Sequence, residues 1–370
     1  MNMITPRTEA ELADCIAGAQ RPMQVVGGGT RSVGTTGGVV LTSRGLSGIS
    51  LYEPGSLTLV AQAGTPLAEI EAALSTEGQR LPFEPMDHRG LLSNTGEPTI
   101  GGVFAANVSG PRRIQVGAAR DFLLGVRFVD GTGRILKNGG RVMKNVTGYD
   151  LVKLMAGSKG RLGVISEVAF KVLPLPEVMV TLVIKGLDDM AAVRALSQAL
   201  GSPFEVSGAA HWPGQGTFLR IEGFAGSVAY RAGKLREMLG GEIEEGAQRW
   251  AGIRDVAPFH GVAGDIWRLS VKPSDAPEIV ARSGAQEALY DWGGGLIWLR
   301  TAPGTDLRGR IAAFQRHATL LRADAETLAR LPVEQPEPPA VATLSAGIRA
   351  KFDPRGIFVT HTDVPQATLS

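Results

Sequence analysis

The segment that most constrains this chain is residues 25–32, with the sequence VVGGGTRS. It predicts a short strand that runs into three consecutive glycines, followed by Thr30, Arg31 and Ser32. A backbone without side chains can approach a ligand closely, and successive N–H groups in such a turn form a nest for an anion such as a pyrophosphate. The segment is not G-x-G-x-x-G and no crossover helix follows it, which excludes a Rossmann dinucleotide site. A glycine-rich hairpin loop without a ligand would have the same sequence.

A second glycine-rich segment, residues 97–110, has the sequence EPTIGGVFAANVSG. Thr99 is suited to cap a helix that starts with Ile100, Gly101 and Gly102. The positive end of that helix would favour a phosphate or the edge of a ring. Nearly every side chain is small, so the segment could lie flat against a planar ligand. Tight packing of a helix on a sheet, with no ligand, is the alternative.

A third segment, residues 144–176, contains Gly157, Gly160 and Gly163 before an apolar run that predicts a strand. The backbone of Gly163 and Ile165 could bind a ligand there. An ordinary glycine turn explains the spacing equally well.

Composition limits the possible functions. The chain has 370 residues, enough for two domains and a sizeable core, and its net charge of +2 is too small to indicate a nucleic-acid surface. Cys15 is the only cysteine, so an internal disulfide and a cluster held by four thiolates are both excluded within this chain. The five histidines are widely scattered, and no metal site is indicated.

The first residues do not predict a secretory signal, because Glu9, Glu11 and Asp14 interrupt the apolar stretch that such a signal needs. No run of about 18 apolar residues is found that would span a membrane. We expect a cytoplasmic protein that reaches the inner face of the cell membrane only through partners. Its expected partners are small molecules and other proteins.

The pattern of elements divides the chain into three parts. Residues 1–176 contain many short strand signals between Gly, Pro and Ser turns, and Pro174 and Pro176 mark a boundary. Residues 177–331 repeat the pattern strand, helix, strand, strand, helix, strand, which predicts helices on one face of an antiparallel sheet. The second copy includes a helix predicted over residues 306–317. Residues 332–370 are predicted to form a proline-rich linker and a short helix near residues 344–352, so the predicted class is α+β.

In this order and spacing, the three glycine-rich segments resemble the vanillyl-alcohol oxidase family, whose members carry a PCMH-type FAD-binding domain. The resemblance covers residues 5–176, and IRAKFDPRGIF at residues 348–358 is similar to the segment that returns to the FAD domain in that family. It implies a two-part FAD-binding domain and, between its parts, a cap domain with two ferredoxin-like halves. The positions that it implies around FAD are Val26, Gly27, Gly28, Gly29, Thr30, Arg31, Ser32, Thr99, Ile100, Gly101, Gly102, Asn107, Gly110, Asp121, Gly163 and Ile165.

Within that family the chain is most similar to the FAD-binding subunits of bacterial glycolate oxidase. This implies a part in the oxidation of glycolate to glyoxylate, by accepting or relaying electrons through FAD. The implied partners are a sister FAD-containing catalytic subunit and an iron–sulfur subunit. The histidine-rich motif that the catalytic subunits use for substrate and metal is absent from the sequence.

Two further departures from the family bear on the cofactor and on the end of the chain. Many members tether the flavin through His or Cys, but Thr30 stands where a histidine is expected and Cys15 falls on the first predicted helix, which implies non-covalent FAD. The usual asparagine-proline-glycine ending is replaced by Val359, Thr360 and His361.

Three arginines, Arg220, Arg268 and Arg300, each lie inside an apolar strand of the predicted cap. If one face of the cap sheet covers the flavin, a guanidinium there could bind the carboxylate of a small 2-hydroxy acid in bidentate fashion. We assign this role to Arg268, although arginines on strands more commonly face solvent. His88 is interpreted as a loop residue rather than a base.

Two other functions fit the same residues. The chain could be a stand-alone FAD-dependent oxidase or dehydrogenase of another 2-hydroxy acid or sugar acid, or a flavin-free structural subunit of the same complex. The sequence lacks the phosphate loop, the H-E-x-x-H motif and the G-x-S-x-G motif, so nothing in it points to ATP hydrolysis, zinc proteolysis or serine-type acyl transfer.

Overall fold

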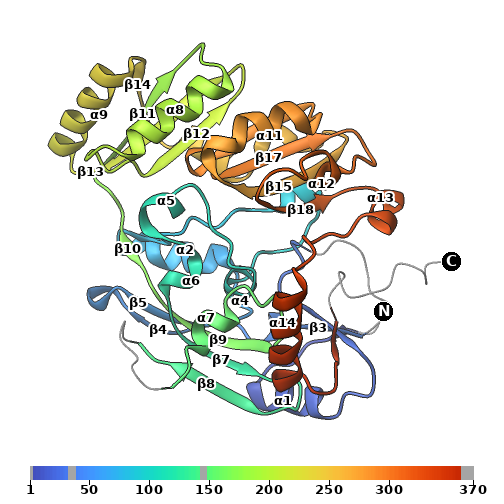
Figure 1. Cartoon of the computed structure of the whole chain (residues 1–370). Coiled ribbons are helices and arrows are strands. Elements are labelled where there is room, and N and C mark those ends of the chain that lie inside the picture. The colour runs from blue at the N-terminus through green and yellow to red at the C-terminus, as the bar shows by residue number, and fades with distance from the viewer. Residues whose placement is uncertain (1–2, 32–38, 142–147, 360–370) are drawn as a thin grey trace.

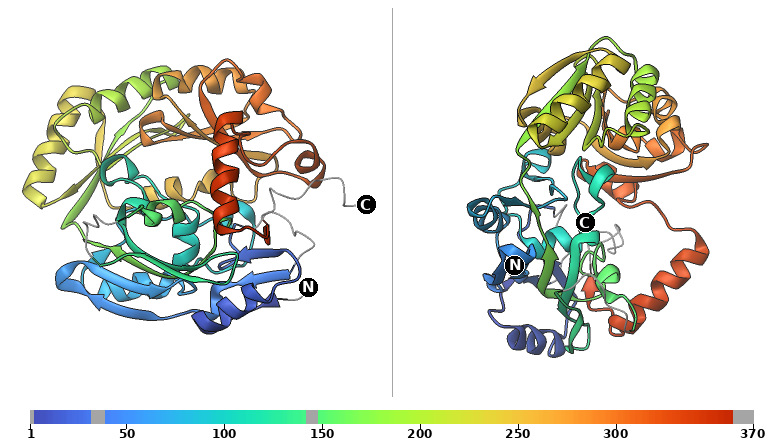
Figure 2. Two further views of the ribbon diagram at one scale, coloured as in Figure 1. Left: turned by 60° about the horizontal axis from the view of Figure 1, so that its bottom comes forward. Right: turned by 90° about the vertical axis from the view of Figure 1, so that its left-hand side faces the viewer.

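The chain folds into an upper part built on one large sheet and a lower part built on three smaller sheets (Figures 1 and 2). The computed structural model describes residues 3–31, 39–141 and 148–359. Three sequence predictions fall partly outside these ranges: Ser32, the first residues of the third glycine-rich segment, and the ending at Thr360 and His361. None of the helices in the described ranges is long and apolar enough to cross a membrane.

A four-stranded parallel sheet in the order β1-β3-β2-β19 forms one side of the lower part. Its strands are β1 (Met3–Ile4), β3 (Val39–Thr42), β2 (Met23–Val26) and β19 (Phe358–Val359). Helix α1 (Glu9–Ala17) packs on this sheet because Leu12 and Ile16, one helical turn apart, are both fully buried. The strand that enters the first glycine turn, β2, therefore has a neighbour on each side.

A five-stranded antiparallel sheet in the order β4-β5-β9-β7-β8 forms the other side of the lower part. Phe104 packs at its core, with its ring centroid 5.4 Å from those of Phe83 and Phe170. The strands are β4 (Ile49–Glu53), β5 (Thr58–Gln62), β9 (Val164–Lys171), β7 (Leu123–Val129) and β8 (Ile135–Gly139), and a small pair is formed by β6 (Gln79–Arg80) and β10 (Leu173–Pro174). The helices of this part are α2 (Leu67–Thr76), α3 (Arg89–Leu92), α4 (Ile100–Ala105), α5 (Arg113–Val116), α6 (Ala119–Phe122) and α7 (Leu151–Met155).

The upper part is the predicted cap, and its structure confirms the repeated pattern that the sequence predicts. Its eight-stranded sheet has the order β14-β11-β13-β12-β16-β17-β15-β18, in which each half has the strand order of a ferredoxin-like unit. The first half contains β11 (Val178–Ile184), α8 (Asp189–Leu200), β12 (Gly208–Trp212), β13 (Gly216–Gly223), α9 (Ala225–Leu239) and β14 (Glu242–Glu245). After α10 (Gln248–Arg254), the second contains β15 (Asp265–Val271), α11 (Ala276–Ser283), β16 (Glu287–Asp291), β17 (Leu296–Thr301), α12 (Leu307–Arg310) and β18 (Arg316–Arg322).

Helix α12 is a single turn and not the helix predicted over residues 306–317. Asp306 caps it by accepting a hydrogen bond from Gly309 N–H at 3.1 Å. Arg316 and His317 instead pair with Val271 and Ser270 of β15, so the sheet takes residues that the prediction gave to the helix.

The two halves of the cap meet where His211 of β12 pairs with Tyr290 of β16. The Tyr290 hydroxyl donates to Asp189 Oδ2 at 2.6 Å, and His211 Nε2 lies 3.3 Å from Asp189 Oδ1. On its other side, His211 Nδ1 lies 2.9 Å from the Thr217 hydroxyl. Side-chain hydrogen bonds thus add to the strand pairing at the boundary between the two halves of the cap.

After the cap the chain returns to the lower part, as Figures 1 and 2 show. Helix α13 (Ala325–Arg330) leads to α14 (Pro339–Phe352), which begins earlier than the helix predicted near residues 344–352. Pro339 occupies the first helical turn, where a missing N–H is tolerated, so the prolines of the linker start the helix instead of preventing it. Strand β19 then pairs with β2.

The cap and the lower part share one hydrophobic core. Trp298 and Ile266 of the cap sheet lie in the same buried cluster as Phe83 and Phe128 of the lower part. The two parts are therefore packed against each other and do not form separate globules.

Candidate functional site

A cavity of about 210 Å³ lies where the three glycine-rich segments come together beneath the cap. Its wall consists of residues 24–31, parts of residues 99–106 and 159–165, β18 residues 319–321, Val333, Glu334 and the side chains Ser43, Ala63, His88 and Leu92. Segments that are far apart in the sequence thus form one site.

Gly27 and Gly28 of the first glycine turn have no space for side chains. A Cβ at Gly28 would lie 1.4 Å from the Glu97 carbonyl oxygen, and one at Gly27 would lie 2.8 Å from Thr99 Oγ1. Gly29 has a φ of 78°, which favours glycine. The sequence prediction that this backbone must be bare therefore has a steric reason.

Carbonyl groups of the same turn accept hydrogen bonds from the protein, whereas three of its described amides donate none to the described residues. Arg44 donates to the Gly28 carbonyl at 2.6 Å, and Glu97 N–H donates to it at 3.0 Å. Within the described residues, the N–H groups of Gly28, Gly29 and Thr30 donate no hydrogen bond. Since buried N–H groups need an acceptor, three successive amides of this kind suit a phosphate.

The second segment offers a flat wall and few free donors. Thr99 caps α4 by accepting from Gly102 N–H at 3.4 Å, as the sequence predicts. However, the amides of Ile100 and Gly101 donate to the carbonyl groups of Thr65 and Ala63, at 3.0 and 2.8 Å. Those amides are already used, so this short helix contributes a surface without side chains rather than the phosphate donors that its sequence suggested.

Arg31 connects the first two segments. Its guanidinium donates to the carbonyl oxygen of Gly102 and lines the cavity. Burial lowers the pKa of Arg31 to about 10, which still leaves the side chain protonated near neutral pH. In the described part of the chain, the charged lining consists of the cations Arg31, Lys159 and Arg161 and the carboxylate Glu334, a balance suited to a dianionic diphosphate.

The third segment supplies the opposite wall. Gly160 and Gly163 have φ values of 80° and 149°. A Cβ at Gly160 would lie 3.0 Å from the Val25 side chain, and one at Gly163 would lie 2.7 Å from the Val129 carbonyl oxygen. Gly163 and Ile165 line the cavity together with the backbone that leads into β9.

Four of the predicted positions lie away from the cavity wall. Ile100 is fully buried in the core, and Asn107 accepts a hydrogen bond from Arg120 N–H at 2.9 Å. The Gly110 carbonyl accepts from Trp292 Nε1 at 3.0 Å, and Asp121 accepts from Ala118 N–H at 2.8 Å. These residues shape the loops behind the wall. The predicted positions that do line the cavity are Val26, Gly27, Gly28, Gly29, Thr30, Arg31, Thr99, Gly101, Gly102, Gly163 and Ile165.

His88 lines the cavity although the sequence interpretation gave it no role. Its Nδ1 lies 3.2 Å from the Met86 carbonyl oxygen. Burial, followed by the charges of Arg31 and Arg268, lowers the pKa of His88 to about 3. The imidazole is therefore neutral at physiological pH. No motif surrounds this residue, so the sequence held no signal for its position.

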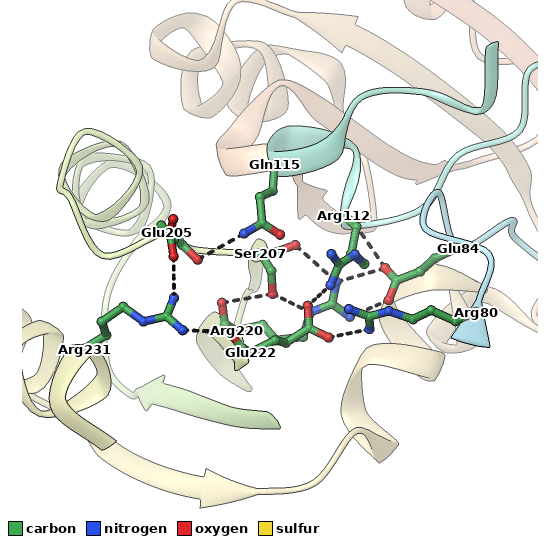
Figure 3. Close-up of polar contacts among 9 residues, drawn as sticks. All are labelled: Arg80, Glu84, Arg112, Gln115, Glu205, Ser207, Arg220, Glu222 and Arg231. Atoms are coloured by element: carbon green, nitrogen blue, oxygen red, sulfur yellow. Dashed lines mark hydrogen bonds and ion pairs between the residues drawn. The ribbon is translucent and has the colours of Figure 1, made fainter. Parts of the chain in front are cut away.

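The structure distinguishes the three cap arginines. Arg220 donates two hydrogen bonds of 2.9 Å to the Glu84 carboxylate, within the buried network shown in Figure 3. Arg300 donates to Glu287 at 2.8 Å. Both guanidinium groups already have carboxylate partners.

Arg268 is different. Its guanidinium lies over Trp292 and Trp298, at 5.3 and 5.9 Å from the ring centroids. In the part of the chain that the structure describes, no carboxylate forms an ion pair with it; the nearby Asp291 accepts from Trp292 N–H instead. Burial, followed by the charge of Arg113, lowers the pKa of Arg268 to about 10. Arg268 lies outside the cavity wall, but its cross-strand neighbour Thr319 lines it.

The described residues contain no group of three or more His, Cys, Asp or Glu side chains arranged to hold a metal ion. What the site presents is a bare, cationic backbone cradle under an antiparallel cap. That combination fits an FAD-binding flavoprotein, and residues 2–139 match the model of a family described as an FAD binding domain. The chain accordingly contains a PCMH-type FAD-binding domain.

The particular family follows from a relative of nearly the same extent. The "Glycolate oxidase subunit GlcE" of Escherichia coli (strain K12) is 39% identical over 323 residues, which cover 87% of this chain and 86% of that protein. The chain belongs to the family of this subunit.

Two further proteins are similar to this chain, one in sequence and one in fold. "Glycolate oxidase subunit GlcD" of Bacillus subtilis (strain 168) is 30% identical over 60% of this chain and 47% of its own length. Among solved structures, alkyldihydroxyacetonephosphate synthase is similar with a TM-score of 0.70 and 15% identity, over 96% of this chain and 76% of that one. At that identity the likeness shows the fold alone.

Proposed function

We propose that this chain is the FAD-binding subunit of a glycolate oxidase, or glycolate dehydrogenase, complex. It takes part in the oxidation of glycolate to glyoxylate by accepting or relaying electrons through non-covalently bound FAD. The observation that carries this proposal is the row of three amides at Gly28, Gly29 and Thr30, which donate no hydrogen bond to any described residue and share one cavity with the wall without side chains at Gly101 and Gly102.

Bound FAD would supply a two-electron acceptor, and the protein would supply its environment. The three amides and the Thr30 hydroxyl would hold the diphosphate, and Arg31 would offset its charge. Gly101 and Gly102 would lie against the flavin and keep water from it. Arg268 would bind the carboxylate of the 2-hydroxy acid, since of the three cap arginines it is the one without an ion pair in the described residues.

The proposed partners are a sister FAD-containing catalytic subunit and an iron–sulfur subunit. Two observations support them: the relatives are named as subunits, and this chain has a single cysteine, so electrons that travel through a cluster must leave it. We place the complex in the cytoplasm, in contact with the inner face of the membrane through partners. Cell fractionation with and without the partners tests this location.

One comparison of two preparations tests the function. The chain is purified alone and with co-isolating partners, and FAD absorbance and glycolate-dependent dye reduction are measured in both. A yellow chain that needs its partners for turnover supports the proposal. Turnover by the chain alone would indicate a stand-alone oxidase. A colourless chain that takes up no added FAD would overturn the proposal and leave a structural subunit.

The mode of attachment is tested separately. Cys15 lies on α1, away from the cavity, and Thr30 cannot form the usual tether, so acid precipitation should release all of the flavin. If the colour stays with the protein, the attachment is covalent, and His88 is the histidine in the described lining to examine.

A further inference from the structure

A carboxylate from the linker after the cap reaches the wall of the FAD cavity on the lower part. Glu334 accepts hydrogen bonds from Lys159 Nζ and, at 3.2 Å, from Arg161 Nη1. All three side chains line the cavity. Two segments that are far apart in the sequence are therefore joined by ion pairs beside the place assigned to the cofactor.

The residues just before Glu334 are hydrogen-bonded to the cap. Leu320 N–H of β18 donates to the Val333 carbonyl at 2.8 Å, and Arg308 donates to the carbonyl groups of Pro332 and Val333 at 2.6 and 2.9 Å. The residues before Glu334 thus extend the edge of the cap sheet, before the chain descends to α14 (Figure 1). Glu334 is therefore anchored to the edge of the cap sheet.

The backbone at Lys159 is hydrogen-bonded to the segments that line the proposed FAD cavity. Lys159 N–H donates to the Ala105 carbonyl at the end of α4, at 2.8 Å. Lys159 has a φ of 55° and is followed by Gly160, which packs on Val25 of β2. Its backbone is thus tied to two of the three segments that form the cradle.

The ion pairs are partly shielded from water. The exposed fractions of the three side chains are 26% for Glu334, 27% for Arg161 and 44% for Lys159. Burial alone would raise the pKa of Glu334, but Lys159 and Arg161 outweigh it and lower the pKa, so the carboxylate stays charged. The cap edge cannot separate from the lower part here unless both ion pairs break.

We propose that Glu334, Lys159 and Arg161 form an ionic clasp that holds the cap edge and linker against the FAD cavity and slows the release of FAD. The proposal rests on the FAD site described above and adds to it a residue that controls retention of the cofactor. Glu334 is a positioning residue: it acts by keeping the wall closed and not by contact with the reacting atoms.

The test measures FAD release, not turnover. The full chain is loaded with FAD and diluted, and the rise in flavin fluorescence gives the dissociation rate for the wild type, Glu334→Gln and the control Glu337→Gln. Glu337 belongs to the same linker but bonds to Ser345 and lies outside the cavity wall. Glu334→Gln should release FAD roughly five- to tenfold faster, the size expected when a half-buried carboxylate loses two ion pairs. Glu337→Gln should match the wild type.

A second set of variants distinguishes loss of the ion pairs from misfolding. In a Lys159→Met, Arg161→Met double variant, the added Glu334→Gln change should no longer alter the release rate, because the clasp is already open. Salt should accelerate release from the wild type and have little effect on Glu334→Gln. Equal release rates for the wild type and Glu334→Gln, or slower release from the variant, would overturn the clasp. Failure of the wild type to bind FAD would instead overturn the proposed function.

Discussion

Gly28 has no room for even a methyl group, because the Glu97 carbonyl oxygen occupies the place of a Cβ. Gly28→Ala must therefore displace the turn, with a cost of roughly 2 kcal/mol or more and loss of FAD binding. Fluorescence titration with FAD and thermal unfolding check both effects. Gly233→Ala is the matched control: it lies inside α9 with open space around it and should be neutral or slightly stabilising. Unchanged FAD affinity in Gly28→Ala would contradict the cradle.

Arg268 allows a test of substrate binding at the scale of one side chain. Arg268→Lys keeps the charge but loses the bidentate fork, so KM for glycolate should rise by about tenfold or more in the assembled complex while FAD content stays the same. Arg300→Lys, whose parent residue already pairs with Glu287, should change KM little. If Arg268→Lys leaves KM unchanged, the substrate binds to the sister subunit and this chain relays electrons.

The sequence shows the residues of the cradle but not all of their neighbours. The place of Gly27 and Gly28 in the site is predictable, because consecutive glycines in a turn indicate that another group approaches the backbone closely. The sequence does not distinguish the surroundings of the three arginines, because each lies in an apolar strand. Only the fold shows that Arg220 meets Glu84 while Arg268 meets two tryptophans. His88 and Glu334 reach the cavity through contacts between distant segments, which no local pattern encodes.

At the scale of elements, the join between the halves of the cap depends on a few side chains. Tyr290→Phe removes the hydroxyl that donates to Asp189 and should destabilise the protein by about 1.5–3 kcal/mol, as expected for a hydrogen bond to a charged group. Denaturant unfolding measures this loss. Tyr230→Phe, on an exposed face of α9, is the control and should have almost no effect. Equal stability of the two variants would mean that strand pairing alone holds the join.

Element types were more predictable than element ends. Short apolar runs between turn signals identify both copies of the cap pattern, and they fit strands such as β13, in which every residue from Gly216 to Glu222 is buried. Helix α12 is shorter than predicted because β15 recruits Arg316 and His317, and α14 is longer because Pro339 fits its first turn. In α4, the carbonyl groups of Thr65 and Ala63 take the amides that looked available from the sequence alone. The differences at α12 and α4 come from tertiary contacts, whereas the difference at α14 is local to its first turn.

At the scale of the whole molecule, a buried ion network fastens the cap to the lower part (Figure 3). Glu222 of β13 pairs with Arg80 at 2.7 Å and with Arg112, both of the lower part. Burial alone would raise the pKa of Glu222, but Arg220, Arg112 and Arg80 together lower it to about 2. A carboxyl group with a lowered pKa stabilises the fold above its unfolded pKa, near 4.5, and this stability is lost as the pH falls toward 2.

Glu222→Gln should therefore cost about 3–5 kcal/mol at neutral pH, because it leaves the arginines with too little negative charge. It should also remove part of the stability change between about pH 4.5 and 2. Unfolding measured across that range, with Glu244→Gln on the exposed strand β14 as control, checks both expectations. A variant as stable as the control at pH 7 would show that apolar contacts alone hold the two parts together.

The division of the chain at residue 176 stays a prediction, since Trp298 of the cap shares a core with Phe83 of the lower part. Charge and apolar packing together make the two parts one unit. We therefore expect that neither part can be isolated with the full cavity, whose wall contains residues from both.

The pairing of β19 with β2 has a consequence for biosynthesis. β2 delivers the chain into the first glycine turn, and one of its flanking strands is made only after the whole cap has been translated. A nascent chain on the ribosome lacks this strand, so we expect flavin uptake to follow synthesis of Phe358. Products that stop short of this residue should accumulate as colourless protein.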